Sequence, residues 1–178
     1  MLGKRRKLSL AQGAAASSLG LAAGLVSLFL ATLDINLLAR MVLLFVAWFA
    51  LWFFSHGLAH HVTGTLVGIR FQYYYLGRSA IRKLKLPIIP RVMNRVPVPV
   101  LKTDPESMKH ATVRSRRIMY RSGAIVSMIL PWLIIPESFA LGPVIGLLFL
   151  ALVLGNDLFT LYFSPKTGDF YRARKAAE

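Results

Sequence analysis

Three of the four histidines of this 178-residue chain fall within the short segment SHGLAHHVTG. His56 and His60 are four residues apart, so on a helix their side chains lie on one face. Imidazole is a common ligand of divalent metals, and this spacing allows one helix to supply two ligands. The segment ends a long apolar stretch, where polar side chains are costly and usually functional. His56 and His60 are therefore candidate metal ligands.

A third ligand has to be an imidazole or a carboxylate, because the chain contains no cysteine. His60 is 20 residues beyond Arg40, and Asp157 is 20 residues beyond Glu137. If both helices enter the membrane from the same side, His60 and Asp157 lie at about the same depth. Two histidines and one aspartate with an open fourth position form a known zinc arrangement.

Two other polar residues compete for a place in this site. Asp169 could fold back toward the histidines as a ligand, although by itself it is more typical of a helix N-cap for residues 170–177. His61 points away from the face shared by His56 and His60, which suits a supporting role or binding of a cofactor. The alternative for all three histidines is an interfacial cluster that hydrogen-bonds to water, lipid or neighbouring helices. His110 is expected to be solvated.

The composition identifies a polytopic membrane protein with a single domain. Hydrophobic residues make up 56% of the chain and charged residues 16%, against about 25% charged residues in soluble domains. The net charge is +15, from 22 Lys and Arg against 7 Asp and Glu. In a membrane protein, basic residues in short loops orient the helices and attract anionic lipid headgroups, so nucleic acid is not an expected partner.

Hydropathy predicts an all-α fold of about four transmembrane helices, each about 20 residues long. Small residues at the start of the first helix would allow close contact with a neighbour. Pro136 and Glu137 are expected to end the third helix. The predicted spans are residues 14–33, 38–64, 118–135 and 139–163.

The distribution of basic residues predicts the orientation. Lys and Arg cluster before the first span, between the second and third spans, and after the fourth, whereas only Arg40 lies on the opposite side. This asymmetry places both termini and the loop of residues 71–117 in the cytoplasm, with the helices in the cytoplasmic (inner) membrane. The basic start, MLGKRRKLSL, followed by a long apolar segment, is expected to be an uncleaved signal anchor.

The cytoplasmic loop is predicted to contain extended chain. The segment FQYYYLG is aromatic and is expected to form an interfacial belt or a short strand, while VPVPV favours an extended edge strand or polyproline II. Prolines throughout the loop exclude a long helix there. These are Pro87, Pro90, Pro97, Pro99 and Pro105.

Three segments resemble the site-2 protease family of intramembrane zinc metalloproteases. HGLAHHVTGTLVGIRF is similar to the family's His-Glu-x-x-His zinc helix, and RSGAIVSMI is similar to its small-residue helix after a membrane-associated loop. GNDLFTLYFSPKTGDFYRA resembles the last core helix, where an Asn and an Asp-Gly segment supply the third ligand. The order matches over residues 38–173 and implies a site-2-protease-like core with a zinc site.

The departures from this family argue against peptide hydrolysis. Gly57 stands where the family carries its glutamate base, so no side chain there can accept a proton. The Asp-Gly pair is absent because Gly168 precedes Asp169, which leaves the third ligand open between Asp157 and Asp169.

The sequence therefore predicts a non-proteolytic pseudoenzyme that serves as an accessory or scaffold subunit among other membrane-protein subunits and could retain zinc. Two alternatives are an active metalloprotease with a displaced base and a tetrapyrrole (chlorophyll or haem) binder that uses His56, His60 or His61 as an axial ligand.

Overall fold

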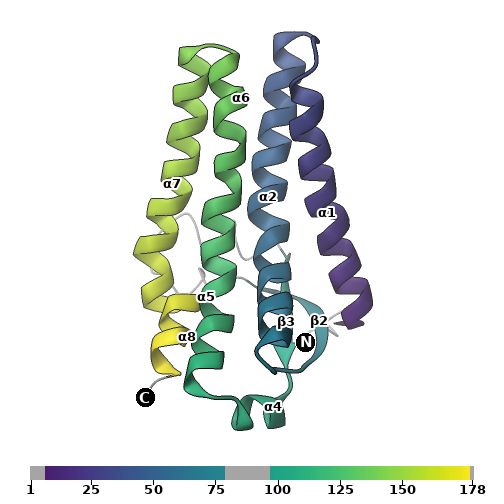
Figure 1. Cartoon of the computed structure of the whole chain (residues 1–178), viewed down its shortest axis with the longest axis vertical. Helices are drawn as coiled ribbons and strands as arrows, with labels where there is room; N and C mark the ends of the chain where they lie inside the picture. Colours follow the sequence, from purple (N-terminus) through teal and green to yellow (C-terminus); the bar gives the residue numbers. More distant parts are fainter. Residues whose placement is uncertain (1–6, 79–96, 177–178) are drawn as a thin grey trace, which may run out of the picture.

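Four long apolar helices lie side by side in the computed structural model, which describes residues 7–78 and 97–176 (Figure 1). Helix α1 spans Leu10–Ala31, α2 spans Leu37–Leu66 and α7 spans Pro143–Thr167. The third long helix consists of three consecutive segments, α5 (Val113–Ile129), η2 (Leu130–Ile134) and α6 (Ile135–Ala140). All four are long and apolar enough to cross a membrane.

The apolar surface of these helices is largely exposed, which fits helices surrounded by lipid. Only 17% to 33% of each spanning window is buried within the protein. The buried apolar core lies between α1, α2, η2 and α7, and its fully buried members are small or aliphatic side chains such as Leu44, Ala47, Leu51, Ile134 and Val153. Four such helices indicate a multi-pass membrane protein.

Helices α1 and α2 pack closely because small residues line the buried face of α1. These are Gly13, Ser17, Gly24, Ser27 and Ala31. A side chain on Gly24 would contact Ala50, and one on Gly20 would overlap the ring of Phe54. The expected close contact along the first span is therefore present.

The helix ends follow local signals. Ser9 and Gln12 form a capping box at the start of α1, Asn36 caps α2, and Thr112 caps α5 through Ser115 N. The connections at the end near Arg40 are short, residues 32–36 and 141–142, as the sequence indicated.

The third and fourth helices differ from their predicted limits. Pro136 and Glu137 lie inside α6 rather than ending the third helix, because proline is tolerated in the first turn of a helical segment. The fourth helix starts at Pro143, after Gly142 with φ of 130°, and continues to Thr167. Asn156 and Asp157 therefore lie within α7, not at its end.

A small antiparallel sheet packs at the other end of the helices. Strand β1 (Lys7–Leu8) pairs with β2 (Phe71–Arg78), and β2 pairs with β3 (Pro97–Thr103). The aromatic segment is thus a strand, and the proline-containing segment is extended from Pro97 onward. Helix α4 (Pro105–His110) follows β3, with Pro105 in its first turn. Several features predicted from the sequence lie outside the described residues. These are Pro87, Pro90, the basic residues at positions 4–6 and the end of the expected helix 170–177.

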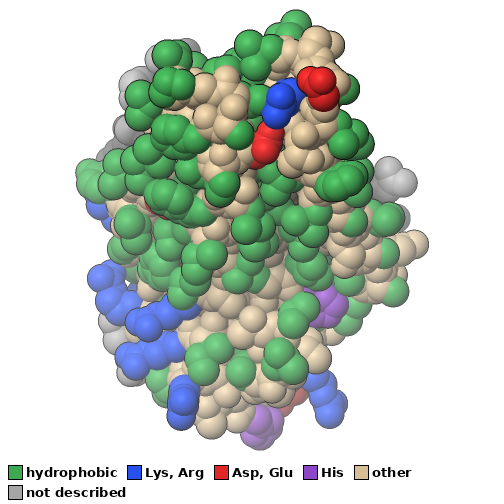
Figure 2. All heavy atoms as spheres, turned by 45° about the horizontal axis from the view of Figure 1, so that its top comes forward, with side chains coloured by type: hydrophobic (Ala, Val, Ile, Leu, Met, Phe, Trp, Pro, Cys, Tyr) green, Lys and Arg blue, Asp and Glu red, His purple; other side chains and the backbone are tan. Residues whose placement is uncertain are grey.

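The charge distribution separates the two ends of the molecule. On the face seen in Figure 2, most Lys and Arg side chains gather toward one end, and at the other end basic and acidic side chains lie next to each other. Arg40 pairs there with Glu137, with 2.7 Å between Nη2 and Oε1. Arg40, on the side with few basic residues, is thus neutralised by an acidic partner. This agrees with the uneven distribution of basic residues from which the orientation was predicted.

Candidate metal site

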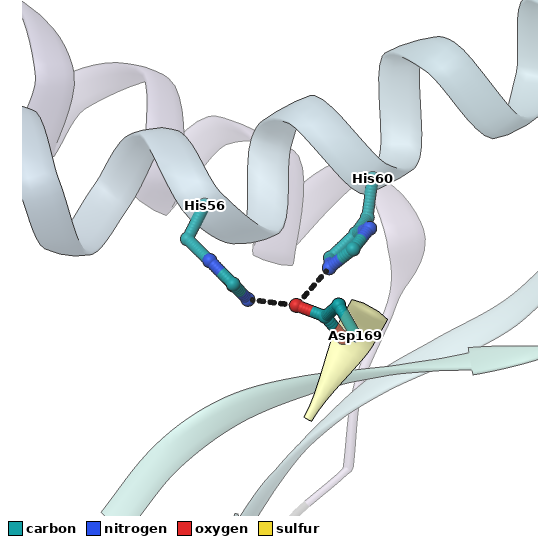
Figure 3. A group of neighbouring side chains, drawn as sticks. All are labelled: His56, His60 and Asp169. Atoms are coloured by element: carbon teal, nitrogen blue, oxygen red, sulfur yellow. Dashed lines mark ion pairs between the residues drawn. The ribbon is translucent and has the colours of Figure 1, made fainter. Parts of the chain in front are cut away.

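Asp169 lies between His56 and His60 (Figure 3). Its Oδ2 atom is 3.1 Å from Nε2 of His56 and 3.3 Å from Nε2 of His60. The two imidazole rings are 4.9 Å apart between centroids and nearly perpendicular, at 89°. One potential ligand atom from each residue lies within 4.8 Å of the other two. The three residues form a compact group that could hold a metal ion.

Two separate parts of the chain form this group. His56 and His60 are one turn apart on α2, so their side chains share a face as the spacing predicted. Asp169 begins the short helix α8 (Asp169–Lys175), which turns back from α7 at Gly168 and packs on α5. The Ser164 hydroxyl accepts a hydrogen bond of 3.1 Å from the backbone N–H of Phe170 and fixes this turn.

The N-cap role expected for Asp169 is wrong. Gly168 occupies the N-cap position of α8, and the side chain that accepts from the first turn of this helix is Ser164 rather than Asp169. The Asp169 carboxylate points instead toward the two histidines, because the turn at Gly168 brings the start of α8 beneath α2 (Figure 3).

The outer ring nitrogen of His60 is held by the backbone of α5. Nδ1 of His60 is 2.7 Å from the carbonyl oxygen of Met119, which can only accept a hydrogen bond. Nδ1 therefore carries the hydrogen, and in the neutral ring Nε2 presents a lone pair to Asp169.

The outer ring nitrogen of His56 is held in the same way. Nδ1 of His56 is 3.3 Å from the hydroxyl of Ser127, and that hydroxyl donates to the carbonyl of Ala124 at 3.1 Å. When the Ser127 hydroxyl hydrogen points to the Ala124 carbonyl, as the 3.1 Å separation allows, Nδ1 of His56 is the donor in this contact. Nε2 of His56 then also presents a lone pair.

When both imidazoles are neutral, three hydrogen-bond acceptor atoms therefore face one another. Two Nε2 lone pairs and a carboxylate oxygen repel one another at these distances unless a positive charge lies among them. That charge can be a proton on a ring nitrogen or a metal cation. With bonds of 2.0–2.2 Å and tetrahedral angles, zinc ligands are about 3.4 Å apart, close to the His–Asp separations of 3.1 and 3.3 Å.

The three side chains differ in exposure. The side chains of His60 and Asp169 are 14% and 13% exposed, whereas that of His56 is 42% exposed. Protein atoms would thus surround most of a metal held here, and an accessible coordination position would remain near His56. This arrangement fits a three-ligand site with an open fourth position.

Gly123 of α5 makes room for His60. A side chain at this position would overlap the His60 imidazole, so the ring occupies the space that a glycine leaves. Gly123, Ser127 and the Met119 carbonyl were not predicted as parts of the site. The available signal is the set of small residues in RSGAIVSMI, since small residues allow a close approach but do not show what approaches.

Asp157 does not belong to this group. Its Oδ2 accepts a hydrogen bond of 2.9 Å from Trp132 Nε1, and its Oδ1 accepts one of 3.3 Å from Asn156. The neighbouring Asn156 lies 3.5 Å from the carbonyl of Ser127, so this part of α7 does reach the level of His56. The sequence predicted that Asp157 lies level with His60. The contacts instead place Asn156 near Ser127, the partner of His56, and Asp157 beside Trp132.

His61 supports the sheet rather than the His–Asp group. Its Nδ1 is 3.1 Å from the Tyr74 hydroxyl, and its ring packs edge-on against Phe71 and Tyr74. Burial raises the pKa of Tyr74 to about 12, so its phenol stays protonated in this contact. Tyr74 itself fills the space over Gly13 of α1. His61 thus connects α2 to β2.

Comparisons of the chain with protein-family models, with curated proteins and with solved structures gave no match. The functional argument therefore rests on the geometry of the described residues.

Proposed function

We propose that this chain is a non-proteolytic membrane protein that holds a divalent metal, zinc foremost, between His56, His60 and Asp169, and that acts as an accessory or scaffold subunit of a membrane complex. The observation that carries the proposal is the convergence of three acceptor atoms. Their outer hydrogen bonds leave both inner Nε2 atoms available, and Asp169 supplies a negative charge that a cation would neutralise.

Zinc is the best match to this donor set. Two imidazoles and one carboxylate, without a thiolate, form sites that accept zinc with a fourth position left for water or another ligand. A bound zinc would supply a Lewis acid and would also join α2 to α8. The protein's own contribution is orientation, because Met119 and Ser127 of the α5 region hold the two rings from outside.

The surroundings support a role other than peptide hydrolysis. Gly57 follows His56 directly and provides no carboxylate beside the metal position. Asp157 is engaged by Trp132, and Glu137 pairs with Arg40 at the far end of the helices. Asp169 would be a ligand and so would be poorly placed to serve as the base as well. The segments that resemble site-2 proteases would then keep the arrangement of that family without the glutamate that accepts the proton.

The exposed apolar helices support a role as a subunit. Between 17% and 33% of each spanning window is buried within the chain, so most of the apolar surface remains free for lipid or for the helices of another protein. The short connections near Arg40 leave little polar material on that side. A metal that fixes α8 to α2 would stabilise the opposite, basic end.

A tetrapyrrole is less well supported by the geometry. An axial histidine needs a ring that faces a wide apolar slot, whereas His56 and His60 both face Asp169 and His61 bonds to Tyr74. An absorption spectrum of the purified chain tests this directly, because a chlorophyll or haem absorbs visible light and a zinc site does not.

Metal analysis tests the main proposal. The full chain is purified in detergent, incubated with zinc, desalted and analysed for metal by elemental analysis. We expect about one equivalent of zinc in the wild type and loss of most of it when His56 and His60 are both replaced by Ala. His110→Ala is the matched control, because His110 is an exposed histidine of α4. Equal zinc in all three proteins would contradict the proposal.

A further inference from the structure

A second polar site lies next to α8, at the basic end of the molecule. Residues of α4, α5 and α8 line a pocket of about 230 Å³. Arg116 and Tyr120 of α5 form one wall, and Tyr171, Arg172 and Lys175 of α8 form another. This volume is below the range of about 300–1,000 Å³ for drug-sized ligands, so it suits a small group such as a single phosphate.

The described part of the pocket lining carries positive charge. Three of the described lining residues are cations, and none of them is an Asp or Glu. Within residues 7–78 and 97–176, neither Arg116 nor Arg172 takes part in an ion pair. The nearest acid along α8, Asp169, faces the two histidines. An anion entering the pocket would therefore meet guanidinium groups that no carboxylate of residues 7–78 or 97–176 neutralises.

Arg116 adds an independent observation. Its Nε atom is buried, and in the described part of the chain it has no hydrogen-bond partner. A buried donor on a charged group is costly when it lacks an acceptor, and such groups usually mark a missing partner. The guanidinium group is well suited to oxyanions, because its planar donors match the oxygens of phosphate.

We propose that the pocket between α5 and α8 binds a phosphate oxyanion, with Arg116 and Arg172 as its principal ligands and with the phenols of Tyr120 and Tyr171 available as further donors. The pocket lies at the start of α5 and beyond the end of α7, so a lipid headgroup or a soluble phosphate could supply the group. This site uses none of the His–Asp residues and does not depend on the proposed metal function.

The first arm of the test uses inorganic phosphate. The full chain is placed in nanodiscs of phosphatidylcholine alone, and phosphate is titrated by calorimetry at constant ionic strength. Arg116→Gln and Arg172→Gln should each weaken binding by roughly ten-fold or more, as expected for loss of a charged hydrogen-bond donor. Arg117→Gln is the matched control, because it removes the same charge from the exposed face of α5 outside the pocket.

The second arm uses nanodiscs in which about one lipid in ten is phosphatidylglycerol, and native mass spectrometry counts the anionic lipid retained. Loss of retention in the two pocket variants but not in Arg117→Gln supports a headgroup as the source, and a response to phosphate alone supports a soluble ligand. Equal losses in pocket and control variants would mean general surface attraction and would overturn the proposal, as would binding in neither arm. If Arg116→Gln fails to fold, the exposed Arg172 carries the same test.

Discussion

Trp132 donates an indole hydrogen bond of 2.9 Å to Asp157, and this contact keeps the Asp157 carboxylate at η2 instead of at the histidine pair. Asp169 is the carboxylate that meets His56 and His60. The two aspartates are only 12 residues apart, but a helix end and a turn separate them. Because the two aspartates lie at different positions, the same substitution at each one tests which of them is the metal ligand.

The first prediction is that Asp169→Asn and Asp157→Asn differ in zinc binding. Loss of the Asp169 charge removes the anionic ligand, so we expect zinc affinity to fall at least about 10–100-fold, the range seen when even outer partners of a metal site are lost. Asp157→Asn keeps the shape of the side chain and leaves the His–Asp group unchanged, so its affinity should match the wild type. Competition with a zinc chelator measures both. A larger loss for Asp157→Asn would assign the ligand role to that residue.

The second prediction concerns the space that Gly123 leaves for His60. Alanine at this position would overlap the His60 ring and push it from the Met119 carbonyl and from Asp169. We expect zinc affinity to fall about 10–100-fold, because the metal ligand is misoriented. Gly155→Ala on α7 is the control, since nothing lies within 4 Å of an added side-chain carbon there. Similar affinities for the two variants would show that His60 does not hold the metal.

The third prediction is that the wild type does not cleave peptides, whereas Gly57→Glu gains activity if the metal is bound. A side chain at Gly57 has room, because nothing lies within 4 Å of its first carbon. A positioned carboxylate base typically contributes 10²–10⁴-fold to a rate. Gly57→Gln has nearly the same shape but cannot act as a base, and it should stay inactive. The assay is cleavage of a transmembrane peptide in detergent, followed by mass spectrometry.

Cleavage by the wild type would favour the alternative of an active metalloprotease. Robust cleavage by the wild type that disappears in His56→Ala would show that another group acts as the base. In that case the scaffold proposal would be withdrawn, while the zinc site would stand.

The fourth prediction concerns the pair at the opposite end of the helices. Arg40 donates both to Glu137 and, through Nε at 2.8 Å, to the carbonyl of Ala31. Glu137→Gln leaves this guanidinium half-buried without its charge partner, so the free energy of unfolding should fall by about 1.5–3 kcal/mol. Asp34→Asn removes an exposed charge from the same end and should change it by about 0.5 kcal/mol or less. Unfolding in mixed micelles with increasing denaturing detergent measures both.

The fifth prediction is the orientation in the membrane. The chain has no cysteine, so Asp34→Cys and Lys109→Cys each introduce a single exposed thiol. The distribution of basic residues places residue 109 in the cytoplasm and residue 34 outside. An impermeant thiol reagent applied to intact cells should label only the variant at position 34. Labelling of position 109 instead would reverse the assigned orientation.

The sequence alone determined the elements that depend on local physics. Long apolar runs have to become helices in a membrane because their backbone groups have no other partners, so four spans could be predicted with limits a few residues from those observed. The i, i+4 spacing placed His56 and His60 on one face for the same local reason. The aromatic segment FQYYYLG was predicted as an interfacial belt or a short strand, and it forms the strand Phe71–Arg78.

Only the tertiary structure decided which distant groups meet. Helix periodicity and depth could bring Asp157 to the level of the histidines, but they could not show that Trp132 binds its carboxylate. The turn at Gly168 brings Asp169 back onto α2, and Gly123 opens the space in which His60 lies. These contacts join residues far apart in the chain through packing of α5 and α8, and packing of that kind leaves no periodic signal along a sequence.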